Sequence, residues 1–243
     1  MQYEDGIGCH SLTPDGESAM IIYAETTGSF LSSGGDIMSQ CAGVVLCGGR
    51  SRRMGRAKAL LPFGPETMLA RVVRLLGEVP GEVVRPVIVV AAPNQELPAL
   101  PGEVEVARDR REDRGPLEGL AVGLRAAGDR VDAVFATACD VPLLLPTFVG
   151  RMIELSTGHE ITVPHIEGHD HPLSAVYRAA VLPAVEALLS ADRLRPAFLF
   201  DQLRTRRVTA AELADVDPRL QSLANVNDPT DYQAALAAAK IDS

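Results

Sequence analysis

Residues Ala42–Leu61 read AGVVLCGGRSRRMGRAKALL, and this stretch decides the fold. It begins with an apolar run over 42–47 of the kind that forms a buried strand, and the run breaks at Gly48 and Gly49. Four arginines and Lys58 follow the break. A buried strand that leads into a glycine turn surrounded by cations is typical of a phosphate-binding site.

The spacing within this turn differs from that of the commonest phosphate loops. Five residues separate Gly49 from Gly55, and Lys58 does not follow a glycine, so the stretch is neither a Walker A loop nor a GxGxxG loop. The paired glycines still allow the backbone to approach phosphate oxygens closely. The side chains that can donate hydrogen bonds to such a phosphate are Ser51, Arg53 and Lys58. A solvated surface loop is the alternative interpretation.

Charge is distributed unevenly along the 243 residues. The formal net charge is −9, and residues 1–40 hold six carboxylates but no lysine or arginine. The remaining residues are therefore nearly neutral, apart from the local group of cations after Gly49. This pattern favours a small anionic ligand and argues against nucleic acid, which needs a wider basic face. Only Lys58 and Lys240 among the 23 basic residues are lysines, which singles out Lys58 beside the turn.

The composition is ordinary for a globular protein, with 47% hydrophobic and 23% charged residues. No apolar run approaches the roughly 18 residues of a membrane span, and the N-terminus lacks a signal-peptide pattern. We therefore expect a cytoplasmic protein with no membrane contact. None of the cysteines forms a CxxC pair, so we expect free thiols, mostly buried. These cysteines are Cys9, Cys41, Cys47 and Cys139.

From residue 41 onward, apolar strands alternate with helical patterns. The expected strands are 42–47, 87–91, 104–106, 132–138, 161–163, 172–177 and 206–209. The expected helices are 66–78, 116–127, 146–155, 180–190, 196–203 and 229–240. This alternation predicts a three-layer α/β fold with a mostly parallel, doubly wound sheet. We expect one domain over 41–240, preceded by a disordered or loosely attached extension over 1–40 with a candidate edge strand at 18–27.

Two carboxylates follow predicted strands and are therefore expected at the carboxyl edge of the sheet, where ligands bind in open α/β folds. Asp140 follows a buried strand directly, and a single carboxylate among phosphates is a usual Mg²⁺ ligand. Its alternative role is to cap the next turn. Asp109 opens the charged segment 109–119, which reaches the same edge or forms an exposed loop whose charges pair with one another.

Two further groups carry polar side chains. The loop 164–171 contains three histidines, His165, His169 and His171, but their spacing matches no usual zinc site, so a substrate-facing loop is the better interpretation. Asn225 and Asn227 lie on one side of an extended segment before the last helix. Either could cap that helix, or Asn227 could add a neutral oxygen to a metal site.

Taken together, these blocks resemble the molybdenum cofactor guanylyltransferases, which belong to the Rossmann-like nucleotidyltransferase superfamily. The blocks are Leu46–Gly55, Lys58–Pro62, Gly115–Gly119, Cys139–Pro142, His171–Arg178 and Asn225–Pro229, in the family's order, and the resemblance covers about 41–240. The double glycine is similar to the guanylyl enzymes rather than to the cytidylyl relatives, which usually carry Ala-Gly.

The resemblance implies a role for several residues. Leu46, Cys47 and Gly48 would lie along the guanine nucleotide, and the chemistry of the turn described above adds Gly49 and Ser51 beside its phosphates. Lys58 would contact the phosphates and act in catalysis with Arg53 and Asp140. Asp109 matches an acidic residue of the nucleotide site, Asp140 matches the Mg²⁺ ligand, and Asn227 matches a position that often completes the metal site. Three features depart from the pattern: Cys47 replaces alanine, Ala92 replaces an asparagine found in relatives, and residues 1–40 have no counterpart.

The function that this resemblance implies is Mg²⁺-dependent transfer of GMP from GTP to the phosphate of molybdopterin, with release of pyrophosphate. The implied partners are GTP and molybdopterin or the molybdenum cofactor, together with other cofactor-biosynthesis proteins and molybdoenzyme chaperones. Three alternatives remain open. They are transfer of another nucleotide or to a sugar or polyol phosphate, a non-catalytic accessory protein that binds GTP or molybdopterin, and a scaffold whose arginine loop binds a protein.

Overall fold

The computed structural model describes residues 40–48, 57–81, 84–109 and 114–241, which belong to one compact unit. The strands of its main sheet are β1 (Cys41–Leu46), β4 (Val84–Ala91), β5 (Val104–Arg108), β6 (Ala133–Ala138), β7 (Ile161–Ile166), β8 (His169–Asp170), β9 (Ser174–Arg178) and β10 (Thr205–Val208). Their order is β10-β7-β9-β6-β1-β4-β5, with β8 paired to β7. Only the pairings of β9 and β8 are antiparallel within this sheet, so the mostly parallel sheet is confirmed.

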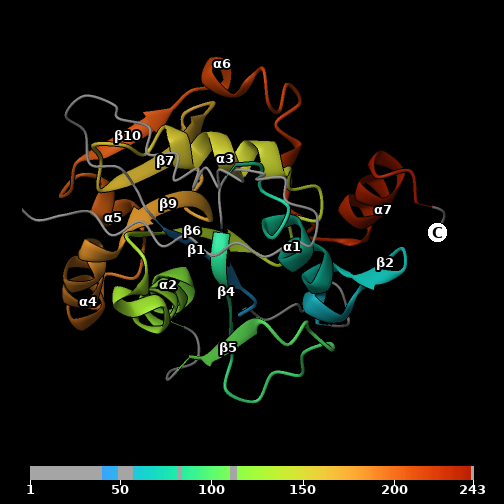
Figure 1. Cartoon of the computed structure of the whole chain (residues 1–243), viewed down its shortest axis with the longest axis horizontal. Helices are drawn as coiled ribbons and strands as arrows, with labels where there is room; N and C mark the ends of the chain where they lie inside the picture. Colours follow the sequence, from blue (N-terminus) through green and yellow to red (C-terminus); the bar gives the residue numbers. More distant parts are fainter. Residues whose placement is uncertain (1–39, 49–56, 82–83, 110–113, 242–243) are drawn as a thin grey trace, which may run out of the picture. The chain divides into compact units, whose positions relative to one another are not determined.

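The helices cover both faces of the sheet (Figure 1). They are α1 (Met68–Leu76), α2 (Gly115–Ala127), α3 (Pro146–Glu154), α4 (Leu182–Ser190), α5 (Ala197–Phe200), α6 (Ala210–Leu213) and α7 (Pro229–Ala238). Single 3-10 turns are η1 (Lys58–Leu60), η2 (Gly128–Arg130), η3 (Ala179–Val181) and η4 (Gln221–Leu223), and β2 (Pro62–Phe63) pairs with β3 (Glu66–Thr67). Among the described residues, no helix is both long and apolar enough to cross a membrane.

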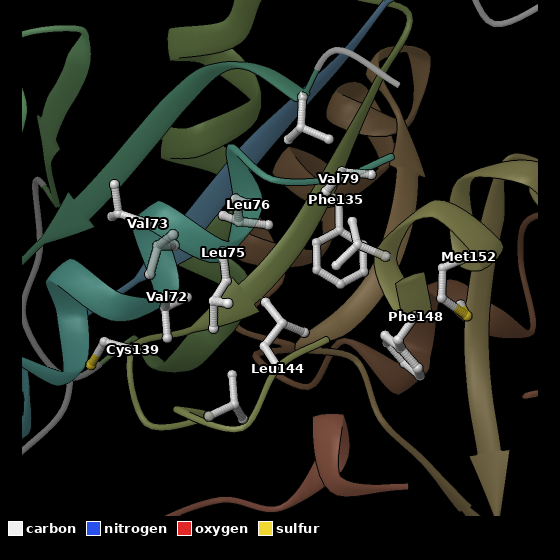
Figure 2. Packing of buried hydrophobic residues seen from close by; sticks show 14 of the residues in the cluster. Val72, Val73, Leu75, Leu76, Val79, Phe135, Cys139, Leu144, Phe148 and Met152 are labelled. Atoms are coloured by element: carbon white, nitrogen blue, oxygen red, sulfur yellow. The ribbon is translucent and has the colours of Figure 1, made fainter. Parts of the chain in front are cut away.

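Two large apolar layers lie on opposite faces of the sheet, and a smaller third cluster packs α7 against β2 and the start of α1. One layer joins α1 and α3 to the strands, and Figure 2 shows Leu75 and Leu76 of α1, Phe135 of β6 and Phe148 of α3 within this cluster. The other layer joins α2 and α4 to the opposite strand faces, as Leu120 and Val185 illustrate. Central strands buried on both faces explain why β1 and β6 read as continuous apolar runs.

Helix α2 approaches β1 closely because glycines line its contact face. A Cβ atom at Gly123 would lie 2.5 Å from Cγ1 of Val44, and one at Gly119 would lie 3.1 Å from Cδ2 of Leu46. Neither position has room for a side chain without a shift of its neighbours. The two glycines therefore bring α2 down onto the strand that leads into the glycine turn.

Several boundaries differ from the sequence-based expectation. The expected helix 66–78 begins later, because Thr67 caps α1 by accepting from the Ala70 N–H at 3.2 Å. Strand β7 continues through Pro164 into the expected loop and forms a hairpin with β8. The expected helix 196–203 is reduced to α5, and the short α6 was not expected. The candidate strand 18–27 lies outside the described residues.

Candidate functional site

The site lies where the carboxyl ends of β1 and β6 meet. The chain proceeds from β1 to β4 and β5 on one side, then returns to β6 on the other side of β1. Helix α1 follows β1 and covers one face, whereas α2 precedes β6 and covers the other. Such a reversal leaves a crevice at the strand ends, and ligands bind there in open α/β sheets. Figure 1 shows these strands at the centre of the sheet.

The end of β1 supplies the first wall of the site. Leu46 and Cys47 are buried, whereas Gly48 is exposed. The Cys47 N–H donates to the Val90 carbonyl at 2.8 Å, and the Cys139 N–H donates to the Leu46 carbonyl at 3.1 Å, so this end is held on both sides. Gly49, Ser51 and Arg53, which the sequence also proposed for the site, lie outside the described residues.

Lys58, Asp140 and Asn227 meet at this edge from three distant parts of the chain. Lys58 opens η1, Asp140 lies in the turn two residues after the end of β6, and Asn227 directly precedes the cap of α7. The Lys58 ammonium donates to Asp140 Oδ2 at 2.8 Å and to Asn227 Oδ1 at 3.1 Å. The Lys58 and Asp140 side chains are 18% and 15% exposed, so this ion pair is shielded from solvent but still reachable.

Asp140 retains an oxygen for a further ligand. Its Oδ1 atom is buried and has no hydrogen-bond partner within the described part of the chain. Its carbonyl accepts from the Val226 N–H at 2.8 Å, which holds the Asn227 segment against the end of β6. Within the same described ranges, no backbone N–H donates to the Asp140 carboxylate, so the alternative of a simple turn cap lacks support.

Asn227 is similarly free from a capping role. Asp228 caps α7 instead, because its Oδ1 accepts from the Thr230 N–H at 2.8 Å and from the Asp231 N–H at 3.0 Å. The side-chain oxygen of Asn227 is therefore available at the site, beside that of Asp140. Asn225 is exposed, and no contact with Lys58 or Asp140 involves it in the described part of the structure.

These oxygen atoms fit a hard divalent cation. Asp140 offers a carboxylate with an unpartnered buried oxygen, and Asn227 offers a neutral carbonyl oxygen nearby. Mg²⁺ in enzymes is commonly held by one or two carboxylates, while water and substrate phosphates complete its shell. The described residues contain no group of three or more His, Cys, Asp or Glu side chains arranged for a metal. A site that relies on substrate oxygens does not need one.

Asp109 occupies a different environment at the end of β5. Burial and the nearby Glu118 carboxylate raise the pKa of Asp109 to about 6. Its Oδ1 atom is buried without a hydrogen-bond partner among the described residues, and a Cβ atom at Gly48 would lie 3.3 Å from its Oδ2. Asp109 therefore lies beside the glycine turn. Arg114 of the same segment pairs with Asp192 at 2.5 Å.

Glu118 is a site residue that the sequence did not single out. It lies in the first turn of α2 and is only 8% exposed. Its charge adds to burial, the larger cause, in raising the pKa of Asp109. An acid in the first turn of a helix is favoured by the partial positive charge of the helix N-terminus. The position of Glu118 just after the start of the expected helix is therefore the signal that could have identified it.

The cysteines are buried, as expected. Cys41, Cys47 and Cys139 are all buried, and Cys9 lies outside the described residues. A thiol–thiol hydrogen bond with Cys139 and burial raise the pKa of Cys47 well above its usual value. A protonated buried thiol is a poor nucleophile, which agrees with a structural role for Cys47 in the position of the usual alanine.

The histidine loop is organised by Asp170. Asp170 Oδ1 lies 2.7 Å from Nδ1 of His165 and accepts from Nε of Arg207 at 3.2 Å. Strand β7 runs parallel to β6 across β9, so this hairpin is at the same sheet edge as Asp140. Burial, foremost, lowers the pKa of His171, so its imidazole is neutral at pH 7. The group presents polar side chains but no zinc-like ligand set.

Comparisons with known proteins agree with this geometry. The family model for the MobA-like NTP transferase domain matches residues 43–207. The chain belongs to the MobA-like NTP transferase family. A probable molybdenum cofactor guanylyltransferase of Mycobacterium ulcerans is 38% identical over 199 residues, which cover 79% of this chain and 92% of the relative. The motif-based resemblance and the expected class of enzyme, a nucleotidyltransferase, are therefore confirmed.

Solved structures of the MobA-like type share the fold. Molybdopterin-guanine dinucleotide biosynthesis protein A from Archaeoglobus fulgidus superposes with a TM-score of 0.66 at 19% identity, covering 82% of this chain and 98% of that one. A Mycobacterium tuberculosis protein solved in complex with manganese gives a TM-score of 0.59 at 18% identity, covering 82% of this chain and 100% of that one. At these identities the likeness shows the fold alone.

Proposed function

We propose that this MobA-like NTP transferase carries GMP from GTP to the phosphate of molybdopterin. An oxygen of the acceptor phosphate bonds to the α-phosphorus of GTP, the bond from that phosphorus to the oxygen bridging the β-phosphate breaks, and pyrophosphate leaves. The acceptor phosphate is already anionic, so the step needs no general base. The observation that carries this proposal is the convergence of Lys58, Asp140 and Asn227 at the switch point.

Each of these side chains has a distinct task. Lys58 neutralises phosphate charge with a compact ammonium, and Arg53 adds to this from the glycine turn. Asp140 and Asn227 would hold Mg²⁺, which when bound supplies positive charge to the transferring phosphate and its leaving group. Leu46, Cys47, Gly48, Gly49, Ser51 and Asp109 would line the nucleotide. Orientation and charge neutralisation together provide the catalysis.

The acceptor is proposed to bind beside the β7–β8 hairpin. Arg207 is 42% exposed and is held by Asp170, so it presents a fixed cation at the sheet edge. Arg207→Ala should raise the KM for molybdopterin while leaving the KM for GTP unchanged. Arg206→Ala is the matched control, because Arg206 is the neighbouring residue of β10 and pairs with Glu212 of α6. Equal effects of the two variants would place the acceptor elsewhere.

The decisive experiment incubates the protein with each NTP, Mg²⁺ and molybdopterin and measures pyrophosphate and dinucleotide product. Product with GTP supports the proposal, and product with CTP but not GTP rejects the guanylyl assignment. A wild-type protein that binds GTP without forming product would favour the accessory-protein alternative. Absence of any nucleotide-dependent rise in Tm would favour the scaffold.

We also propose that residues 41–240 form a single domain that works without the extension 1–40, in the cytoplasm. A chain that begins at residue 40 should retain nucleotide transfer and its Tm. Loss of either would give the extension a structural or catalytic role. Fractionation of the native host, followed by immunodetection, checks the compartment.

A further inference from the structure

Strands β1 and β4 separate at the entrance to the site, and the manner of their separation is informative. Their parallel pairing places Leu46 opposite Val90, and the Cys47 N–H donates to the Val90 carbonyl at 2.8 Å. In a regular parallel ladder the next hydrogen bond would run from the Ala92 N–H to the Cys47 carbonyl. Both groups instead bond to one side chain, that of Gln95.

The Gln95 carboxamide is inserted into the ladder at this point. Its Nε2 donates to the Cys47 carbonyl at 3.0 Å, and its Oε1 accepts from the Ala92 N–H at 3.1 Å. A carboxamide has the same donor and acceptor as a peptide group. It therefore pairs with the free backbone group of each strand while its own width keeps the two strands apart. The sheet thus opens between β1 and β4 without leaving an unpaired backbone group there.

This insertion also fixes the direction of the following N–H group. The Cys47 carbonyl and the Gly48 N–H belong to one planar trans peptide and point in opposite directions. With the carbonyl held toward β4 by Gln95, the Gly48 N–H is directed toward β6 on the other side of β1. Asp140 and Lys58 lie on that side. A backbone donor is thereby aimed into the crevice.

Arg108 holds the segment that carries Gln95. Its Nη1 donates to the Ala92 carbonyl at 2.9 Å and to the Gln95 carbonyl at 2.7 Å, and the Gln95 N–H donates to the Ala92 carbonyl at 3.1 Å. The turn 92–95 is therefore closed at its backbone, and the Gln95 side chain extends from a fixed base. This rigidity is what a group that orients another group requires.

We propose that Gln95 is a positioning residue for nucleotide binding, which acts by aiming the Gly48 N–H at a phosphate of the nucleotide. The inference rests on the proposed function of this site as a nucleotide site. Gln95 itself contacts the protein backbone rather than the ligand. This role of Gln95 would explain how the turn can bind phosphate although its glycines lack the spacing of the usual phosphate loops.

Three variants test this role. Gln95→Ala removes both bonds, whereas Gln95→Glu keeps the acceptor for the Ala92 N–H but loses the donor to the Cys47 carbonyl. Both should raise the KM and Kd for GTP about tenfold. The kcat and the KM for the acceptor should stay within about twofold of the wild-type values. Gln202→Ala is the control, because the Gln202 amide donates locally, to the Phe198 carbonyl at 2.8 Å.

Amide hydrogen exchange gives a readout that does not depend on catalysis. The Ala92 N–H should exchange faster in Gln95→Ala but stay protected in Gln95→Glu. Faster exchange with an unchanged Kd for GTP would overturn the positioning role. A general defect, in which kcat and Tm fall and both KM values rise to a similar extent, would overturn it as well. Binding is measured with all four NTPs, so a preference for another nucleotide overturns only the guanylyl proposal. A wild-type protein that binds none overturns both.

Discussion

Asp140 and Asp109 are two carboxylates at the same sheet edge, and their surroundings are opposite. Asp140 is in contact with the Lys58 ammonium at 2.8 Å. Asp109 has no cation beside it in the described part of the chain, and burial with the nearby Glu118 raises its pKa to about 6. The first environment stabilises negative charge and suits a cation and phosphates. The second disfavours charge and suits a neutral group that donates hydrogen bonds.

The largest effect is expected from removing the charge at the first carboxylate. Asp140→Asn should lower kcat about 10³-fold, because the proposed metal loses its anionic ligand. Turnover with GTP, Mg²⁺ and molybdopterin measures this. Asp129→Asn is the control, since Asp129 is exposed in η2, before the start of β6 and away from the strand end that carries Asp140. A loss of less than about tenfold would remove Asp140 from the catalytic centre.

Separating α2 from β1 tests the second environment, because α2 carries Glu118. Gly123→Ala places a Cβ atom 2.5 Å from Cγ1 of Val44 and should lower the free energy of unfolding by about 1–3 kcal/mol. Denaturant titration measures the loss. Gly102→Ala, where a Cβ atom meets nothing within 4 Å, should be nearly neutral. Equal stability of the two variants would mean that α2 is not tightly seated.

The ionisation of Asp109 predicts a pH-dependent stability. Its pKa is raised from 3.8 to about 6 in the folded protein, so the folded state binds more protons between these values and stability falls as pH rises through them. Asp109→Asn removes this loss and should raise Tm by about 2–4 °C at pH 8. The gain should disappear near pH 4. A gain that is equal at both pH values would contradict the raised pKa.

The smallest effect separates the two causes of that shift. Glu118→Gln removes the neighbouring charge but leaves the burial, which is the larger cause, in place. The pKa of Asp109, followed by carboxyl NMR, should therefore fall only part of the way toward 3.8. A complete return to the ordinary value would make charge repulsion, not burial, the dominant cause.

The sequence predicted the central strands and the meeting of Lys58 with Asp140, because both follow from local patterns. A continuous apolar run is specific for a strand covered on both faces, and residues at parallel strand ends share an edge. Asn227 reaches the same point only through the fold, since the Val226 N–H bonds the Asp140 carbonyl. The residue pattern offered a metal-site oxygen as only one of the roles of Asn227, and the resemblance pointed to the same role.

Other features depend on contacts that no pattern encodes. Pro164 suggested the end of a strand, because proline has no N–H to donate. Strand β7 nevertheless continues, since the pairing there uses the Pro164 carbonyl, which accepts from the His171 N–H at 2.9 Å. The short helix α6 did have a sequence signal, the capping box of Thr209 and Glu212. An analysis based on apolar periodicity does not detect it. Gln95 has none, because its bonds join the ends of two strands distant in sequence.

In the structure the Lys58 ammonium contacts the Asp140 carboxylate, so it competes with a metal ion for the negative charge of that group. A cation bound at the unpartnered Oδ1 of Asp140 would share this carboxylate with an ammonium held 2.8 Å from Oδ2, so the two positive charges repel each other. Nucleotide phosphates that draw Lys58 toward themselves relieve this competition, so each ligand strengthens the binding of the other by the same factor. Metal affinity measured without nucleotide will therefore understate the affinity in the ternary complex, and a Lys58→Ala chain will bind the metal alone more tightly.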